Sequence, residues 1–105
     1  MIKTAPTRYT SKFHFYENDY IIGASIDLYG EYCHTEIDVL KNYIDANTVV
    51  YDIGGNIGYH TVAFASMAKE VHSFEPNDRN YLLLEKNTQH LNNVKLYHCA
   101  CSNVV

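Results

Sequence analysis

The chain has 105 residues, enough for one small domain, and an ordinary globular composition with 47% hydrophobic and 19% charged residues. Its formal net charge is −4, and its eight Lys and Arg residues form no basic stripe. Because binding to duplex nucleic acid depends on neutralising many phosphates, this composition argues against nucleic acid as a partner.

The N-terminal residues and the cysteines indicate the compartment. The first residues, MIKTAPTRYTSKF, are polar and lack the apolar core of a signal peptide. No stretch approaches the ~20 apolar residues of a membrane helix. Cys33, Cys99 and Cys101 include no C-x-x-C pair, so we expect free thiols and no metal site. These features predict a cytoplasmic protein that does not contact a membrane.

The first half of the chain predicts a β-hairpin and a helix. We expect residues 1–12 to be loosely attached. The β-forming residues of 13–28 are interrupted by a turn signal at 17–19, which predicts a hairpin. The stretch TEIDVLKNYI at 35–44 predicts a helix with Thr35 as its N-cap. The helix would bury one apolar face, formed by Ile37, Leu40 and Ile44.

The second half alternates strands and helices. Residues 48–51 are a mostly β-branched run without alternation, typical of a strand buried on both faces of a parallel sheet. We then expect a helix at 59–68, a strand at 70–75, a helix from Asp78 to His90 and a strand at 94–99. This order predicts an α/β fold built on half of an open parallel sheet, with right-handed crossovers.

The end of the sequence bears on the completeness of this sheet. Val105 follows the third predicted strand closely, so we expect a fragment in which further strands are absent. The strand at 48–51 would then leave an open edge, through which the chain could associate with itself.

The stretch YDIGGNIGYHT at 51–61 places three glycines between the first predicted strand and its helix. A P-loop is excluded because no lysine occurs between Asn42 and Ala68, and the spacing fails the G-x-G-x-x-G pattern of dinucleotide sites. The pattern that fits is Asp-x-Gly-x-Asn-x-Gly. An acidic side chain before the glycines suits a ligand with an ammonium group, such as the methionine part of S-adenosylmethionine.

A second acidic residue supports a nucleoside ligand. Glu75 ends the next predicted strand, 23 positions after Asp52. A carboxylate at this place accepts hydrogen bonds from ribose hydroxyls, and neighbouring parallel strands bring their carboxyl ends together. Each feature has a structural alternative, because a glycine cluster is often a plain turn and Glu75 could cap the following helix. Their combination at this spacing favours a nucleoside site.

Three stretches resemble the FkbM family of S-adenosylmethionine-dependent methyltransferases: VVYDIGGNIGYHTVAFA, SFEPNDRNYLLLEKN and NNVKLYHCACS. That family shows a DxGANxGxxT stretch, an EPxxxxxxxLxxNxxxN stretch and a strand ending in Ala-x-Ser. Gly55 replaces the usual alanine of the first stretch. The resemblance covers about residues 29–105, and the matching residues are Asn56, Gly58, Thr61, Glu75, Pro76, Leu84, Asn87, Ala100 and Ser102.

The resemblance implies an incomplete Rossmann-like class I methyltransferase fold, with an extension at 1–28 and a cofactor-binding half at 29–105. S-adenosylmethionine would be the cofactor. Its methionine part would face the glycine loop, its ribose would bind Glu75, and its adenine would lie between 76–77 and 100–102. The implied cofactor-binding residues are Asp52, Gly54, Gly55, Asn56, Gly58, Thr61, Glu75, Pro76, Asn77, Ala100 and Ser102.

The resemblance also implies O-methylation of a hydroxyl group on a sugar or natural product. No general base can be assigned, and structural roles are expected for His60 and His98. Tyr29, Glu31 and Tyr32 are candidates for the acceptor side. We expect this chain alone to be inactive. The alternatives are an NAD(P)-binding oxidoreductase domain and a truncated, non-catalytic nucleoside-binding fragment.

Overall fold

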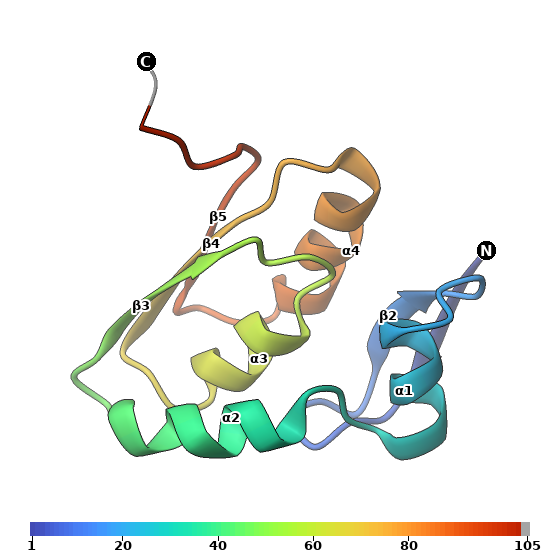
Figure 1. Cartoon of the computed structure of the whole chain (residues 1–105), viewed down its shortest axis with the longest axis horizontal. Coiled ribbons are helices and arrows are strands. Elements are labelled where there is room, and N and C mark those ends of the chain that lie inside the picture. Colours follow the sequence, from blue (N-terminus) through green and yellow to red (C-terminus); the bar gives the residue numbers. More distant parts are fainter. Residues whose placement is uncertain (104–105) are drawn as a thin grey trace.

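The computed structural model describes residues 1–103, which begin with a small N-terminal unit (Figure 1). Its strands β1 (Ile2–Ala5) and β2 (Phe13–Tyr16) pair antiparallel, with Ile2 opposite Tyr16 and Ala5 opposite Phe13. Helix α1 (Ile22–Tyr29) packs beside them. The N-terminal unit, residues 1–30, therefore combines a β-hairpin with one helix.

This arrangement corrects two expectations for the first 28 residues. Residues 2–5 are a strand rather than a loosely attached segment, and they replace residues 20–28 as the partner of β2. Residues 22–29 are helical because Asp19 Oδ1 accepts the N–H groups of Ile21 and Ile22, at 3.1 and 3.0 Å, and so supports the first turn. Gly30, in a left-handed conformation with φ of 69°, ends the helix.

The helix predicted for 35–44 is present as α2 (His34–Leu40) and a following 3₁₀ turn, η1 (Lys41–Tyr43). Ile37 is buried, as its spacing predicted. The predicted cap is wrong: the N-cap position is Cys33, with φ of 52°, and no side chain caps the helix. Leu40 and Ile44 pack against a hydrophobic cluster beside the sheet, so α2 rests on the second half of the chain.

The second half forms the predicted strand–helix order. Strands β3 (Val49–Ile53), β4 (Glu70–Phe74) and β5 (Val94–Tyr97) pair in parallel in the order β3-β4-β5. Helix α3 (Tyr59–Ala65) connects the first two strands and α4 (Asp78–Thr88) the last two. Asn77 caps α4 by accepting the N–H of Asn80 at 3.0 Å. The sequence thus predicted this α/β unit correctly.

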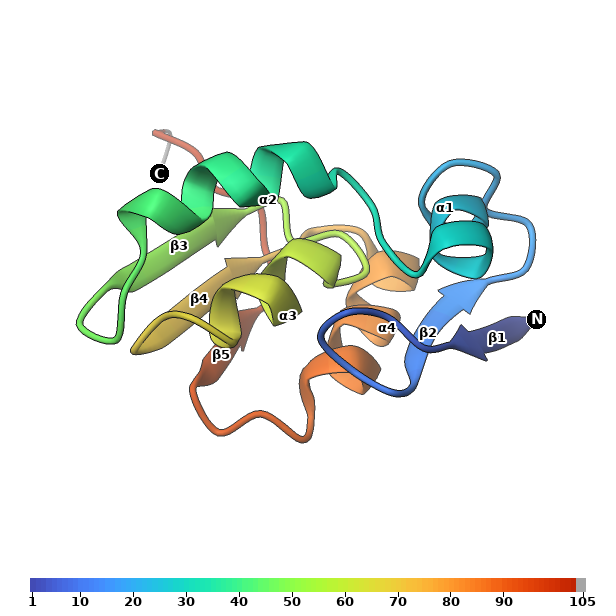
Figure 2. The same cartoon turned by 90° about the horizontal axis from the view of Figure 1, so that it is seen from below.

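Only one face of the sheet is covered (Figures 1 and 2). Helices α3 and α4 lie on the same face because both crossovers run in the same direction across the sheet. On the opposite face β3 exposes Val49, Tyr51 and Ile53, at 46%, 66% and 59%. The prediction that this strand is buried on both faces is therefore wrong, since the side chains on its second face are exposed within residues 1–103.

The core joins the N-terminal unit to the helices of the second half. Phe13, Phe15 and Ile26 pack in one cluster with residues of α3 and α4, among them Tyr59 and Leu83. A second cluster lies between α3 and the sheet. None of the helices within residues 1–103 has the length and apolar character needed to cross a bilayer.

Buried Asn87 connects three parts of this fold. Its Oδ1 accepts the His14 N–H at 2.7 Å, and its Nδ2 donates to the carbonyl oxygens of His14 and Ile57 at 2.9 and 2.8 Å. Asn87 therefore fixes β2 and the glycine loop against α4, which sets the position of the candidate site.

Candidate nucleoside-binding site

The glycine loop, residues 54–58, turns sharply between β3 and α3. Gly54, Asn56 and Gly58 have positive φ values of 81°, 55° and 102°. The N–H groups of Gly54 and Gly55 both donate to the Phe74 carbonyl oxygen, at 2.8 and 2.9 Å. The loop is thus held across the carboxyl end of β4, at the edge where ligands bind in open α/β sheets.

The first two glycines of the loop have different roles. A side chain added at Gly54 would meet no atom within 4 Å, so its backbone is open to a ligand. At Gly55 a Cβ atom would overlap Ser73 Oγ and press on Leu84. Gly55 is therefore required by close packing against β4, whereas Gly54 leaves space in front of the loop.

Asp52 is held by a buried chain of hydroxyl groups. The Thr61 hydroxyl donates to Asp52 Oδ2 at 2.6 Å, and Ser73 Oγ lies 2.9 Å from Thr61 Oγ1. Because the Thr61 proton goes to Asp52, the Ser73 hydroxyl donates to Thr61. Within residues 1–103, Asp52 Oδ1 has no hydrogen-bond partner, which leaves it available to a ligand.

The electrostatic setting of Asp52 follows from its burial. Desolvation is the largest effect and raises the pKa of the carboxyl group, and the charge of Glu75 acts in the same direction. The hydrogen bond from Thr61 and the positive charge of His60 oppose this rise in pKa. A partly buried carboxylate with one unpaired oxygen favours a cationic ligand group.

Glu75 ties the glycine loop to the start of α4. Its side chain is buried, at 6% exposure. Oε1 accepts the Asn56 N–H at 2.8 Å, and Oε2 accepts the Asn77 N–H at 2.9 Å. The cap of α4 is Asn77, so the capping role considered for Glu75 is wrong; its hydrogen bonds instead join the loop to the segment before α4, and both oxygens keep a further lone pair. Contact with a ribose stays a prediction.

Two cavities meet at Gly54. The first, of about 170 Å³, has the charged or titratable residues Asp52 and His60 in its lining. The second, of about 210 Å³, is mainly apolar. The first is lined by Ile22, Tyr32, Asp52, Gly54, Gly55, Asn56, Ile57, Tyr59 and His60. The second is lined by Ile53, Gly54, Phe74, Pro76, Cys99, Ala100 and Cys101.

The predicted site residues divide between these cavities and their supports. Six line a cavity: Asp52, Gly54, Gly55, Asn56, Pro76 and Ala100. Thr61 supports Asp52, Asn77 binds Glu75, and Gly58 turns the loop against Leu84. Ser102 lines neither cavity. The last two residues of the predicted cofactor-binding half, 104–105, lie outside the described chain.

Five residues that line the first cavity are not among the predicted cofactor-binding residues: Ile22, Tyr32, Ile57, Tyr59 and His60. Ile22 was assigned to a strand, and His60 to a structural role. Tyr32 was considered only for the acceptor side. Of its two companions in that hypothesis, Tyr29 is 73% exposed and Glu31 pairs with Arg8 at 2.7 Å. The signal for His60 was its place two residues after the last glycine.

Two other features do not coincide with this site. A depression of about 490 Å³ lies between α4 and β5 and contains none of the predicted site residues. Within residues 1–103, no group of three or more His, Cys, Asp or Glu residues could hold a metal ion. The glycine loop remains the place where cavities and acidic groups converge.

Solved structures resemble this chain in fold. A Streptococcus mutans protein assigned as a methyltransferase, in complex with S-adenosylhomocysteine, matches 64% of this chain and 39% of its own, with a TM-score of 0.60 and 22% identity. An rRNA methylase from Streptococcus thermophilus matches 68% of this chain and 41% of its own, with a TM-score of 0.62 and 20% identity. Precorrin 8W decarboxylase from Methanobacterium thermoautotrophicum matches 89% of this chain and 46% of its own, with a TM-score of 0.59 and 20% identity.

These matches establish a fold and its extent. The sequence matches no protein-family model and none of the curated protein sequences. At identities of 20–22% the structural likeness does not identify an activity, and the FkbM resemblance stays a prediction. The chain spans less than half the length of the three structures described above. It has part of the Rossmann-like α/β fold of class I methyltransferases.

Proposed function

We propose that the two cavities bind S-adenosylmethionine and that the chain is the cofactor-binding portion of a methyltransferase. The observation that carries this proposal is the junction at Gly54, where an open backbone separates an acidic cavity from an apolar one. A ligand crossing it needs a cationic amino-acid end and an apolar, planar end. S-adenosylmethionine has both.

The first cavity suits the methionine part. Asp52 presents Oδ1 to the ammonium group, while Thr61 holds the other carboxylate oxygen and fixes its orientation. The loop backbone at Gly54 approaches the ligand without a side chain in between. These residues bind and orient the cofactor and take no part in bond breaking.

The second cavity suits the adenine ring. Ile53, Phe74 and Pro76 give it apolar walls, and Ala100 adds a small side chain from the segment after β5. Glu75 lies between the loop and α4, and its remaining lone pairs would accept the ribose hydroxyls.

The proposed reaction is O-methylation of a hydroxyl group on a sugar or natural product, in keeping with the FkbM resemblance. S-adenosylmethionine supplies an electrophilic methyl group on sulfur. The protein's contribution is mainly to place an acceptor oxygen in line with that methyl group. Because the chain spans less than half of the matched structures, we propose that other segments hold the acceptor and that this chain alone is inactive.

Calorimetric titration with S-adenosylhomocysteine tests the cofactor assignment. We expect binding at micromolar affinity and a strong loss in Asp52→Asn, which keeps the acceptor for Thr61 but removes the charge. Exposed His90→Gln is the matched control and should bind like the wild type. Binding of NAD in place of S-adenosylhomocysteine would support the oxidoreductase alternative and refute the proposal.

A further inference from the structure

His60 is the basic side chain in the lining of the first cavity, and contacts with three neighbouring residues hold its ring in place. Its Nε2 lies 3.1 Å from Glu36 Oε1, so the Nε2–H donates to that carboxylate. The rings of Tyr32 and Phe64 pack edge-on against it, with centroids at 6.2 and 5.9 Å. These contacts come from α2, the loop before it and α3, and they fix the imidazole at the wall of the cavity.

The remaining nitrogen of this ring is unused. Within residues 1–103, His60 Nδ1 has no hydrogen-bond partner. The side chain is only 23% exposed, so this nitrogen is largely withdrawn from bulk water. When the ring is protonated, Nδ1–H becomes a donor that carries positive charge, while Glu36 balances that charge from outside the cavity.

The cavity therefore contains two complementary groups. Asp52 offers an unpaired carboxylate oxygen, and His60 offers an unpaired nitrogen. The two are close enough for the charge of His60 to lower the pKa of Asp52. An α-amino acid end carries an ammonium group and a carboxylate on the same carbon. The ammonium group is complementary to Asp52, and the carboxylate is complementary to protonated His60.

We propose that His60, held by Glu36, binds the α-carboxylate of the cofactor's amino-acid end through Nδ1–H. This inference rests on the proposed function and adds to it a residue that selects ligands with a free carboxylate. The protonated ring supplies this donor. The neutral ring with its proton on Nε2 would instead direct a lone pair at the carboxylate, which is unfavourable.

Four titratable groups face His60 and could contribute to a proton linkage of ligand binding. They are Glu36 from α2, Tyr32 from the preceding loop, Asp52 from β3 and Tyr59 beside it on α3. Burial raises the pKa of Tyr59 to about 12, and a hydrogen bond with Cys33 raises the pKa of Tyr32, so neither titrates near pH 7. A proton linkage that is lost in His60→Gln is therefore assigned to the histidine.

Two ligands and two variants test the proposal. S-adenosylhomocysteine carries the carboxylate, and its decarboxylated analogue S-adenosyl-3-thiopropylamine keeps the amine and the nucleoside. We expect His60→Gln to weaken binding of the first about ten- to hundredfold, the loss typical of a charge-assisted hydrogen bond, and to leave binding of the second unchanged. His90→Gln should alter neither affinity.

Proton linkage gives an independent readout. Calorimetry over a range of pH, in buffers of different ionisation enthalpy, should show a proton linkage for wild type with S-adenosylhomocysteine that is absent for His60→Gln and for the analogue. Equal weakening of both ligands by His60→Gln, or an unchanged proton linkage in that variant, would overturn the carboxylate assignment while leaving the cofactor site in place. Failure of wild type to bind S-adenosylhomocysteine would overturn both.

Discussion

The packing of Gly55 against Ser73 explains one departure from the FkbM pattern at the scale of single residues. Where that family usually has alanine, this chain has no room for a Cβ atom, because Ser73 Oγ occupies the space. The same hydroxyl donates to Thr61, which in turn holds Asp52. Glycine at position 55 is thus coupled to serine at position 73 and, through it, to the acidic group of the site.

This coupling predicts the outcome of a double-mutant cycle. Gly55→Ala should lower the free energy of unfolding by about 1–3 kcal/mol, because it overpacks a buried position. Ser73→Ala removes the overlapping oxygen, so the same glycine substitution should cost clearly less in that background. Urea unfolding of the four proteins measures both effects. An equal cost in both backgrounds would contradict the packing argument.

The raised pKa of Asp52 predicts that the site opposes stability. A raised pKa means that the folded state holds this proton more tightly than the unfolded state does. The bound proton of Asp52 therefore contributes fully to folding stability below the pKa of the unfolded state, about 3.9. This contribution is lost as the pH rises through the pKa of the folded state. At pH 7 Asp52→Asn should unfold at a higher temperature than wild type, and the difference should vanish near pH 3. A lower melting temperature for the variant at pH 7 would be inconsistent with a desolvated charge.

At the scale of elements, the periodic part of the chain was predictable and the N-terminal unit was not. The order from β3 to β5 follows from local patterns: apolar runs, the Asn77 cap and helical spacing. The pairing of β1 with β2 joins segments separated by seven residues, and the four residues IKTA carry no strong strand pattern. Residues 22–29 contain β-branched side chains, yet they form a helix because Asp19 accepts hydrogen bonds at its start and Gly30 terminates it.

The candidate site was predictable to a similar extent. Residues at the ends of β3 and β4 follow from the rule that carboxyl ends of parallel strands meet. Ile22 could not be found in this way, because it enters the first cavity through the packing of the N-terminal unit. The dual involvement of Glu75 in two backbone hydrogen bonds likewise depends on the tertiary arrangement.

The Asn87 hydrogen bonds predict how strongly the N-terminal unit and the loop depend on α4. Asn87→Ala would leave the N–H of His14 and the carbonyl of Ile57 without their buried partner. We expect a loss of about 2–4 kcal/mol in the free energy of unfolding and faster hydrogen exchange at residues 54–58. Exposed Asn92→Ala is the control and should change neither quantity. Unchanged exchange in the loop would show that Asn87 does not position it.

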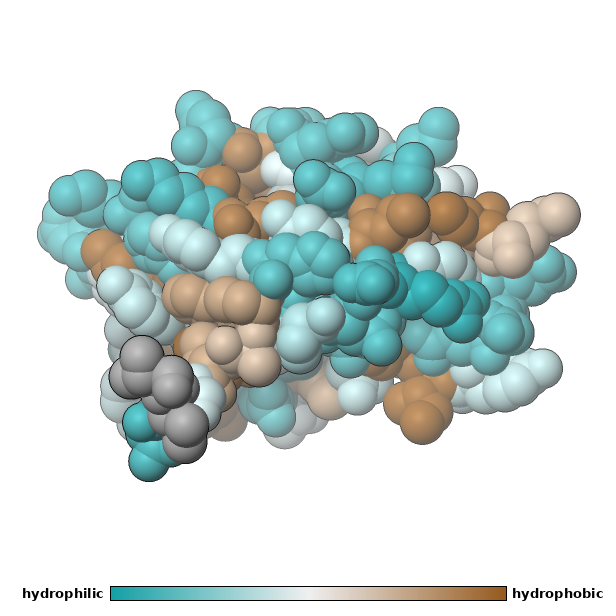
Figure 3. All heavy atoms as spheres, turned by 90° about the horizontal axis from the view of Figure 1, so that it is seen from above, coloured by the Kyte–Doolittle hydropathy of each residue, from teal (hydrophilic) through white to brown (hydrophobic). Residues whose placement is uncertain are grey.

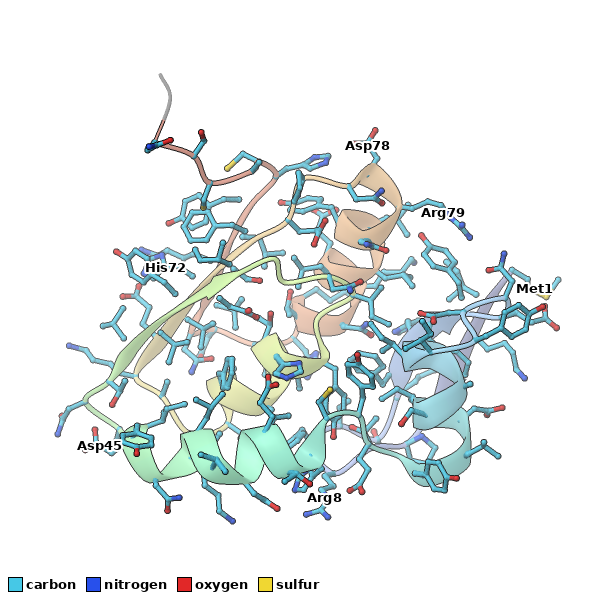
Figure 4. The ribbon with its side chains drawn as sticks, in the orientation of Figure 1. Met1, Arg8, Asp45, His72, Asp78 and Arg79 are labelled. Carbon is cyan, nitrogen blue, oxygen red and sulfur yellow. The ribbon has the colours of Figure 1, made fainter. Side chains whose placement is uncertain are left out.

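At the scale of the whole molecule, the surface contains several separate apolar patches, some of them visible on the face shown in Figure 3. The uncovered face of the sheet carries a row of aromatic rings. Tyr51 and His72 lie 5.1 Å apart, and Phe74 stacks on Tyr97 at 4.6 Å. In Figure 4 His72 points away from the helices. Strand β3 borders this face and has no second neighbour among residues 1–103.

This open edge and face predict self-association of the chain. An unpaired strand with exposed apolar residues offers hydrogen-bonding groups and apolar area to a second copy. Sedimentation velocity should show oligomers that increase with concentration, and Tyr51→Lys should shift them toward monomer. The control Tyr43→Lys changes another exposed tyrosine, which belongs to η1 rather than to a strand of the sheet. A monomer at all concentrations would contradict this expectation.

The central claim is that the cavities on the two sides of Gly54 form one site for a nucleoside joined to an amino acid. The most direct test is the amide NMR spectrum of the labelled chain during titration with S-adenosylhomocysteine and with methylthioadenosine, which lacks the amino-acid end. We predict that S-adenosylhomocysteine shifts the amides of 54–60 and of 99–101, whereas methylthioadenosine shifts mainly the second group. Shifts confined to the depression between α4 and β5, or an unchanged spectrum, would contradict the account.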